Sequence, residues 1–191
     1  EVYERRLADR DGAIRLLQQA ASVAPSADPG QQELARLLAL EQRWPELATA
    51  LERELTTVPA AHLDRQIGLL LRLGELRRDK LAKHADAALA YESVLERQPT
   101  HVPALIALED IYERLGREKD LLRVIEARAE ATEDLIERAA TYTRIAGVKQ
   151  HRGDLDGAIA AFRASFRADP SSRDTFTAME RLCYKHERWV D

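Results

Sequence analysis

Seven prolines divide the chain at spacings that permit only short helices between them. Four of them each stand twelve positions after a small or aliphatic residue, and apolar residues occupy the fourth and eighth positions between. Such a stripe marks one face of an α-helix, and the proline ends it because it cannot continue the helix. The four pairs are Ala13 with Pro25, Leu47 with Pro59, Ala87 with Pro99 and Ala158 with Pro170. Pro29, Pro45 and Pro103 fall where a following helix would begin, so no proline has to lie in the interior of a helix.

A second apolar stripe precedes several of these helices, and flexible or polar residues separate the two. Leu115-Gly116 lies between two stripes, and Arg152-Gly153-Asp154 lies between the next two. Short connections of this kind join antiparallel helices, so the sequence predicts a series of helical hairpins.

Composition supports an all-helical chain. Ala, Leu, Arg, Glu and Lys make up 106 of the 191 residues, and the β-branched residues are few, which excludes a β-sandwich or a doubly wound sheet. The net charge of −4 comes from 29 basic and 33 acidic residues that are interspersed, which disfavours nucleic-acid binding. No stretch approaches the ~20 apolar residues that span a bilayer, so no membrane insertion is expected.

The hairpins themselves repeat in pairs. Ala13 and Pro25 recur as Ala87 and Pro99, an offset of 74 residues, and the segment 1–8 aligns with 75–82 at the same offset. Trp44 corresponds in this register to Glu118, and Trp189 follows 71 residues later. The longer unit is therefore a pair of hairpins.

The segment from Ala139 to Ser172 carries a characteristic set of residues. They are Tyr142, Ile145, Ala146, Gly153, Ala158, Phe162, Ser165 and Pro170. This pattern resembles the tetratricopeptide repeat, a 34-residue helix-turn-helix unit. The repeat from Val102 departs from it at Leu121 and Glu133, and the repeat from Asp28 has Leu47 in place of alanine and lacks the turn glycine.

The resemblance implies an all-α, right-handed superhelical solenoid of stacked antiparallel hairpins. We expect a single array over 1–191 with about five repeats, whose boundaries are 1–27 (partial), 28–61, 62–101, 102–138, 139–172 and 173–191 (partial). The sequence starts at Glu1 without methionine and stops in mid-pattern, so we interpret it as a fragment of a longer chain.

In the family, the leading helix of each hairpin lines a concave groove. The charged and polar residues that the register places there are Arg36, Arg72, Arg78, Asp110, Glu113, Arg144, His151, Arg181 and Lys185. Leu71, Glu75, Ile106, Thr143 and Tyr184 accompany them. Arginine forks bind carboxylates, so we predict a non-catalytic scaffold that holds an acidic peptide or protein. Alternatively these side chains are solvated and pair with helical neighbours.

Two other roles remain open. The chain is alternatively a structural spacer or self-association module that stacks end to end, or the regulatory arm of a larger protein. The carboxylate clamp that holds chaperone C-termini in this family needs two asparagines, and the chain contains none. That specific function is excluded.

No catalytic, cofactor or metal site is predicted. The five histidines have no metal-binding spacing, and no phosphate loop or nucleophile elbow occurs. Cys183 lies on a packing stripe with Phe176 and Met179, which predicts a buried thiol.

The remaining expectations concern single residues and the source. Trp44 and Trp189 are predicted to cap hairpin cores, Gly74 and Gly147 to permit close helix approach, and Gly116 and Gly153 to form turns. The excess of Arg over Lys indicates a GC-rich bacterial gene, and we expect a cytoplasmic protein, or a periplasmic one if a signal peptide was removed.

Overall fold

The computed structural model describes residues 10–23 and 28–186, and every regular element in these ranges is a helix. The chain divides into two compact units, residues 1–97 and 98–191. The all-α helical-repeat class predicted from the sequence is confirmed. The repeat boundaries, the single array and its superhelical course stay predictions.

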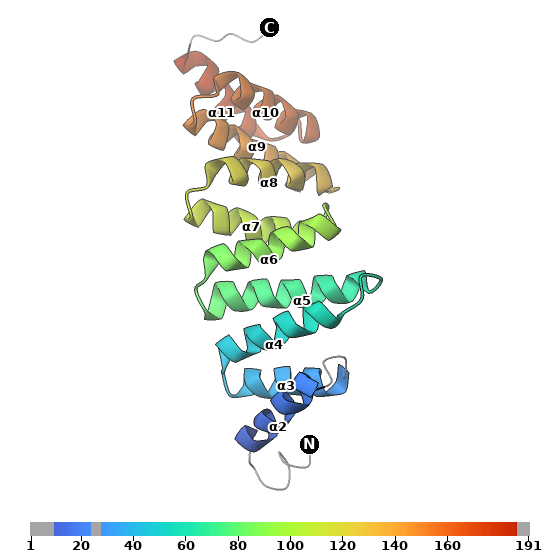
Figure 1. The fold of residues 1–191 in the computed structure, drawn as a ribbon. Helices are drawn as coiled ribbons and strands as arrows, with labels where there is room; N and C mark the ends of the chain where they lie inside the picture. Colours follow the sequence, from blue (N-terminus) through green and yellow to red (C-terminus); the bar gives the residue numbers. More distant parts are fainter. Residues whose placement is uncertain (1–9, 24–27, 187–191) are drawn as a thin grey trace. The chain divides into compact units, whose positions relative to one another are not determined.

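Unit 1 contains five α-helices and one π-helical turn among its described residues (Figure 1). They are α2 (Arg10–Val23), α3 (Asp28–Leu40), α4 (Trp44–Thr57), α5 (Leu63–Glu75), η1 (Leu76–Lys80) and α6 (His84–Arg97). Contacts run between helices that are adjacent in the sequence, as expected for stacked hairpins.

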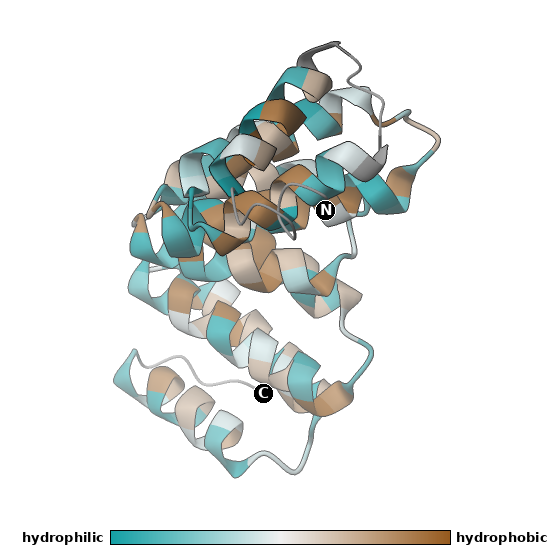
Figure 2. Ribbon diagram, turned by 90° about the horizontal axis from the view of Figure 1, so that it is seen from below, coloured by the Kyte–Doolittle hydropathy of each residue, from teal (hydrophilic) through white to brown (hydrophobic). Residues whose placement is uncertain are grey.

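Unit 2 repeats this arrangement in its described part. Its helices are α7 (Val102–Arg114), α8 (Glu118–Ala131), α9 (Leu135–His151), α10 (Leu155–Ala168) and α11 (Arg173–Lys185). Each again packs on the next one along the chain. Figure 2 shows apolar and polar residues interleaved along the helices, the amphipathic pattern that lets one face of each helix be buried.

The prolines act as the sequence predicts wherever the structure describes them. Pro45 and Pro103 are the second residues of α4 and α7, where a missing N–H leaves no hydrogen bond unmade. Pro59, Pro99 and Pro170 follow the last residues of α4, α6 and α10 by two positions. Pro25 lies outside the described residues.

Side chains cap four of the helices in unit 2. His101, Asp134, Asp154 and Ser172 each accept a hydrogen bond from a backbone N–H in the first turn of the helix that follows. Such bonds satisfy donors that a helix start otherwise leaves unpaired. The sequence therefore fixes where these helices begin.

The turn glycines are confirmed. Gly116 and Gly153 have φ of 65° and 77°, in the left-handed region that glycine adopts at little cost. Gln42 occupies the position 74 residues before Gly116 and has φ of 54°. The backbone turn is thus kept in the repeat that lacks the glycine.

Gly74 marks a close helix contact, as predicted, but Gly147 does not. A Cβ added at Gly74 would lie 2.7 Å from Cζ of Tyr91, whose side chain is buried in α6. A Cβ at Gly147 would meet nothing within 4 Å. The prediction for Gly147 is wrong because its face of α9 is open.

The predicted packing stripes are largely correct but fail at two phenylalanines. Cys183 is buried, as predicted, whereas Phe176 on the same helix is 51% exposed and Phe166 on α10 is 38% exposed. Trp44 packs against the hydrophobic core of unit 1, as expected of a ring that caps a hairpin. Trp189 lies outside the described residues.

The π-helical turn η1 was not predicted. It continues α5 without a break, and Ala82, two residues beyond it, has φ of 53°. π-Helical turns are rare and occur often at functional sites. This one extends the leading helix toward the start of α4.

Candidate functional site

Several residues predicted for the groove pair with neighbours on their own helix. Arg36 forms a bidentate ion pair with Glu33, Arg78 pairs with Asp79, and Asp110 accepts from Arg114. These are the local pairs of the alternative interpretation, and exposed pairs of this kind contribute little to stability.

Arg144 and Glu113, both predicted for the groove, form an ion pair, and Arg144 also pairs with the buried Glu109. Its guanidinium donates to Glu109 at 3.1 Å and to Glu113 at 2.7 Å. Arg128 Nε lies 2.9 Å from the other oxygen of Glu109, without the alignment of a hydrogen bond. These ion pairs tie α7, α8 and α9 together, so Arg144 and Glu113 already have partners inside unit 2.

Glu109 is 2% exposed, and burial raises the pKa of its carboxyl despite the two arginines beside it. Sequence reasoning missed this residue. The signal was available, since Glu109 follows Leu108 where the best-matching repeat has Ala146 after Ile145. A carboxylate in place of a small residue on a packing stripe indicates an internal partner.

Four further charged or polar residues predicted for the groove, Arg72, His151, Arg181 and Lys185, are exposed. Arg72, Arg181 and Lys185 make no ion pair with any residue that the structure describes, and His151 Nε2 lies 3.7 Å from Glu118. Arg72 is on α5, and Arg181 and Lys185 are on α11. The structure therefore distributes the free predicted cations over both units.

Arg72 lines a hollow of about 240 Å³ between α4 and the α5–η1 helix, which we call the Trp44 hollow. Its other lining residues are Trp44, Leu47, Leu51, Glu75, Leu76, Asp79 and Lys80. The Lys80 ammonium lies 5.3 Å from the centroid of the Trp44 ring, within range of a cation–π interaction. Two cations and an aromatic ring thus meet in one depression beside two carboxylates, of which Asp79 is paired with Arg78.

Unit 2 has a hollow of about 280 Å³ in the corresponding position between α7, α8 and α9. Glu118 and Leu121 take the places of Trp44 and Leu47, 74 residues later. Glu113 and His151 also line it, so its charged residues differ from those of the Trp44 hollow. Two predicted residues, Glu113 and His151, are brought together here.

Neither a metal site nor a membrane-spanning helix occurs among the described residues. Among residues 10–23 and 28–186, no group of three His, Cys, Asp or Glu side chains is arranged to hold a metal ion. Within the same ranges, no helix combines the length and apolar character needed to cross a membrane.

Comparisons with known proteins identify the fold. No family model matches the chain. An alignment 102 positions long, which covers 51% of the chain, is 30% identical to cellulose synthase operon protein C of Pseudomonas fluorescens and spans only 8% of that protein.

Solved structures match more of the chain. The C-terminal part of a TPR repeat-containing protein from Cytophaga hutchinsonii has a TM-score of 0.57 at 11% identity, over 94% of this chain and 67% of that one. MamA matches with a TM-score of 0.54 at 13% identity, over 83% of this chain and 81% of that one. YrrB, a TPR protein with an unusual peptide-binding site, matches with a TM-score of 0.52 at 13% identity, over 93% of this chain and 87% of that one. At these identities the likeness concerns the fold alone.

Proposed function

From the premise that the chain has the fold of tetratricopeptide-repeat proteins, we propose that it is a non-catalytic scaffold that binds a partner polypeptide. The bound segment is acidic and lies against the Trp44 hollow of unit 1. The peptide-binding site of YrrB, a protein of the same fold, supports peptide capture by such helices.

The state of Arg72 carries the proposal. It is exposed, it makes no ion pair with any described residue, and it shares its hollow with Lys80. An arginine fork binds a carboxylate through two parallel hydrogen bonds, and a lysine adds a point charge. The Trp44 ring adds apolar surface for the rest of the peptide.

Binding of a fluorescein-labelled hexaglutamate peptide, measured by anisotropy at low salt, tests this proposal. The Arg72→Glu/Lys80→Glu variant should bind at least about tenfold more weakly, since two charge-assisted contacts become repulsive. Arg15→Glu/Lys119→Glu changes the net charge by the same amount and is the matched control, since both side chains are exposed and make no ion pair in the described chain. Equal weakening by both double variants would show only a general charge effect.

Self-association is a second candidate function, favoured by the exposed phenylalanines of unit 2. The rings of Phe166 and Phe176 lie 6.5 Å apart and border a hollow of about 390 Å³. A second copy of the chain would cover this apolar surface. Sedimentation velocity should then show concentration-dependent dimers that Phe176→Ser abolishes, whereas a monomer at all concentrations contradicts this role.

A further inference from the structure

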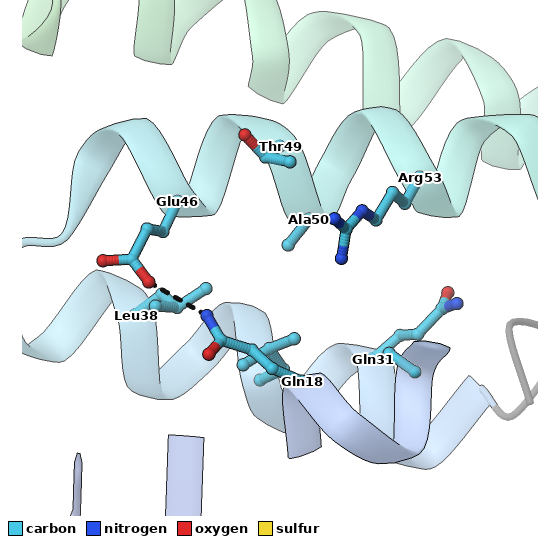
Figure 3. A pocket seen from close by; sticks show the side chains of 9 residues that line it. Gln18, Gln31, Leu38, Glu46, Thr49, Ala50 and Arg53 are labelled. Atoms are coloured by element: carbon cyan, nitrogen blue, oxygen red, sulfur yellow. Dashed lines mark hydrogen bonds between the residues drawn. The ribbon is translucent and has the colours of Figure 1, made fainter. Parts of the chain in front are cut away.

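The exposed face of α11 has covered counterparts in α3 and α7. The three helices are each 13 residues long, and their starts are separated by 74 and 71 residues, so Phe176 corresponds to Gln31 of α3 and to Leu105 of α7. Gln31 is 7% exposed and Leu105 is fully buried, because α4 packs on α3 and α8 packs on α7. Figure 3 shows Gln31 of α3 and Arg53 of α4 on opposite sides of the pocket between these helices. Phe176, by contrast, is 51% exposed.

The same correspondence relates Glu180 of α11 to a buried acid. Glu180 takes the place of Glu109 in α7, which is 2% exposed and lies 2.9 Å from Arg128 of the covering helix α8. Glu180 is exposed and forms no ion pair with any residue that the structure describes. Helix α8 thus gives α7 both an apolar surface and a cation. An occupant of the α11 face should supply the same two groups.

The α11 face itself carries such a cation. Arg173 lines the hollow of about 390 Å³ together with Phe176 and Glu180, is exposed, and also lacks an ion pair in the described part of the chain. Arg173 and Glu180 are seven residues apart, two turns or ~10 Å of helix, so both lie on one side of α11. The face therefore presents a cation, an aromatic ring and an acid in that order.

This order is complementary to a second copy of itself. In a two-fold dimer, if residue i of one copy contacts residue j of the other, then j also contacts i. Two antiparallel α11 helices can therefore place each Arg173 opposite Glu180 of the other copy. The two-fold axis then passes between Phe176 and Thr177, and the two Phe176 rings meet beside it. Both ion pairs flank this aromatic contact.

We infer that α11 pairs with α11 of a second copy in this antiparallel arrangement. The inference rests on the self-association proposed above and names the contact that produces it. Each Arg173 fork binds the Glu180 carboxylate of the other copy, and each Phe176 ring enters the hollow beside Phe166 of the other copy. A 13-residue helix is only ~20 Å long, so the contact is smaller than the ~800 Å² per partner of a standard interface. The dimer should therefore be weak.

Sedimentation velocity of the whole chain, at low salt and at concentrations up to ~1 mM, tests the contact with two charge reversals. Arg173→Glu and Glu180→Arg should each weaken the dimer at least about tenfold, because both ion pairs become repulsive. An equimolar mixture of the two variants should dimerise as the wild type does, because opposite charges again face each other at both ends of the contact. The substituted side chains are exposed, so circular dichroism should show unchanged helix content.

Two further variants serve as controls. Lys119→Glu, at an exposed residue of α8 without an ion pair in the described chain, makes the same charge change as Arg173→Glu and should leave the dimer unchanged. Arg72→Glu alters the Trp44 hollow and should also leave it unchanged, which separates this contact from the proposed peptide site.

The possible failures are distinguishable. A wild type that stays monomeric at every concentration would contradict self-association and this contact together. A wild-type dimer that the reversals do not weaken, that Lys119→Glu weakens equally, or whose two variants stay monomeric when mixed would overturn this contact and leave self-association standing. A general effect of the net charge of −4 would weaken the dimer in Arg173→Glu but strengthen it in Glu180→Arg, which also overturns the contact.

Discussion

Gly74 provides a sharp test of packing at a single residue. Its hydrogen faces the buried ring of Tyr91, and a methyl group there would approach three ring atoms to 2.9 Å or less. Gly74→Ala should therefore lower the free energy of unfolding by ~1–3 kcal/mol, as overpacked cores do. Gly68, on the same helix, has nothing within 4 Å of an added Cβ.

Gly68→Ala is accordingly the matched control. It should raise stability by up to ~1 kcal/mol because alanine is the better helix former. Urea titration followed by circular dichroism compares the two variants. Stabilisation by both would mean that α5 and α6 do not approach each other as described.

Glu109 makes stability depend on pH. Burial raises the pKa of the Glu109 carboxyl above 4.5, its ordinary value in the unfolded chain. The folded state therefore binds the carboxyl proton more tightly than the unfolded chain does. The stabilising effect is complete below pH 4.5 and is lost as pH rises through the raised pKa. In urea titrations, the free energy of unfolding of the wild type relative to that of Glu109→Gln should fall as pH rises from 4.5 through the raised pKa. A relative stability that rises with pH would show that the attraction of Arg128 and Arg144 outweighs burial.

At the scale of a helix, the start of α10 depends on one side chain. Asp154 accepts a 2.9 Å hydrogen bond from the N–H of Gly157. Asp154→Ala should cost about 1 kcal/mol of stability, and Asp154→Asn, which also caps well, should restore most of it. Thermal unfolding of both variants measures this difference, and equal losses would show that the cap does not contribute.

The sequence predicted helix limits better than it predicted side-chain partners. Prolines and turn glycines act locally, so Pro45, Pro103 and Gly116 could be interpreted without knowing what packs nearby. The π-helical turn η1 could not be predicted because a helical pattern does not show one extra residue in a turn. The partners of Arg144 depend on Glu109, 35 positions away. A charged residue on a helix face looks the same whether its partner is a ligand or another helix.

At the scale of the whole molecule, the division into two compact units predicts that a core substitution destabilises mainly the unit that contains it. Leu38 is fully buried in the core of unit 1, so Leu38→Ala should cost ~2–5 kcal/mol. In stacked repeats the stability is a sum of unit and nearest-neighbour terms. Hydrogen exchange should therefore accelerate in α2 to α6 and much less in α7 to α11. Equal acceleration in all helices would contradict a stacked-repeat fold.

The most direct test of the proposed scaffold role is to locate a bound acidic peptide by amide and indole shifts. On addition of hexaglutamate, shifts are expected in α5 and η1 and in the indole N–H of Trp44. In the Arg72→Glu/Lys80→Glu variant these shifts should disappear while the rest of the spectrum stays unchanged. Shifts that persist in that variant, or that never include Trp44, would show that the acidic peptide does not bind at the Trp44 hollow.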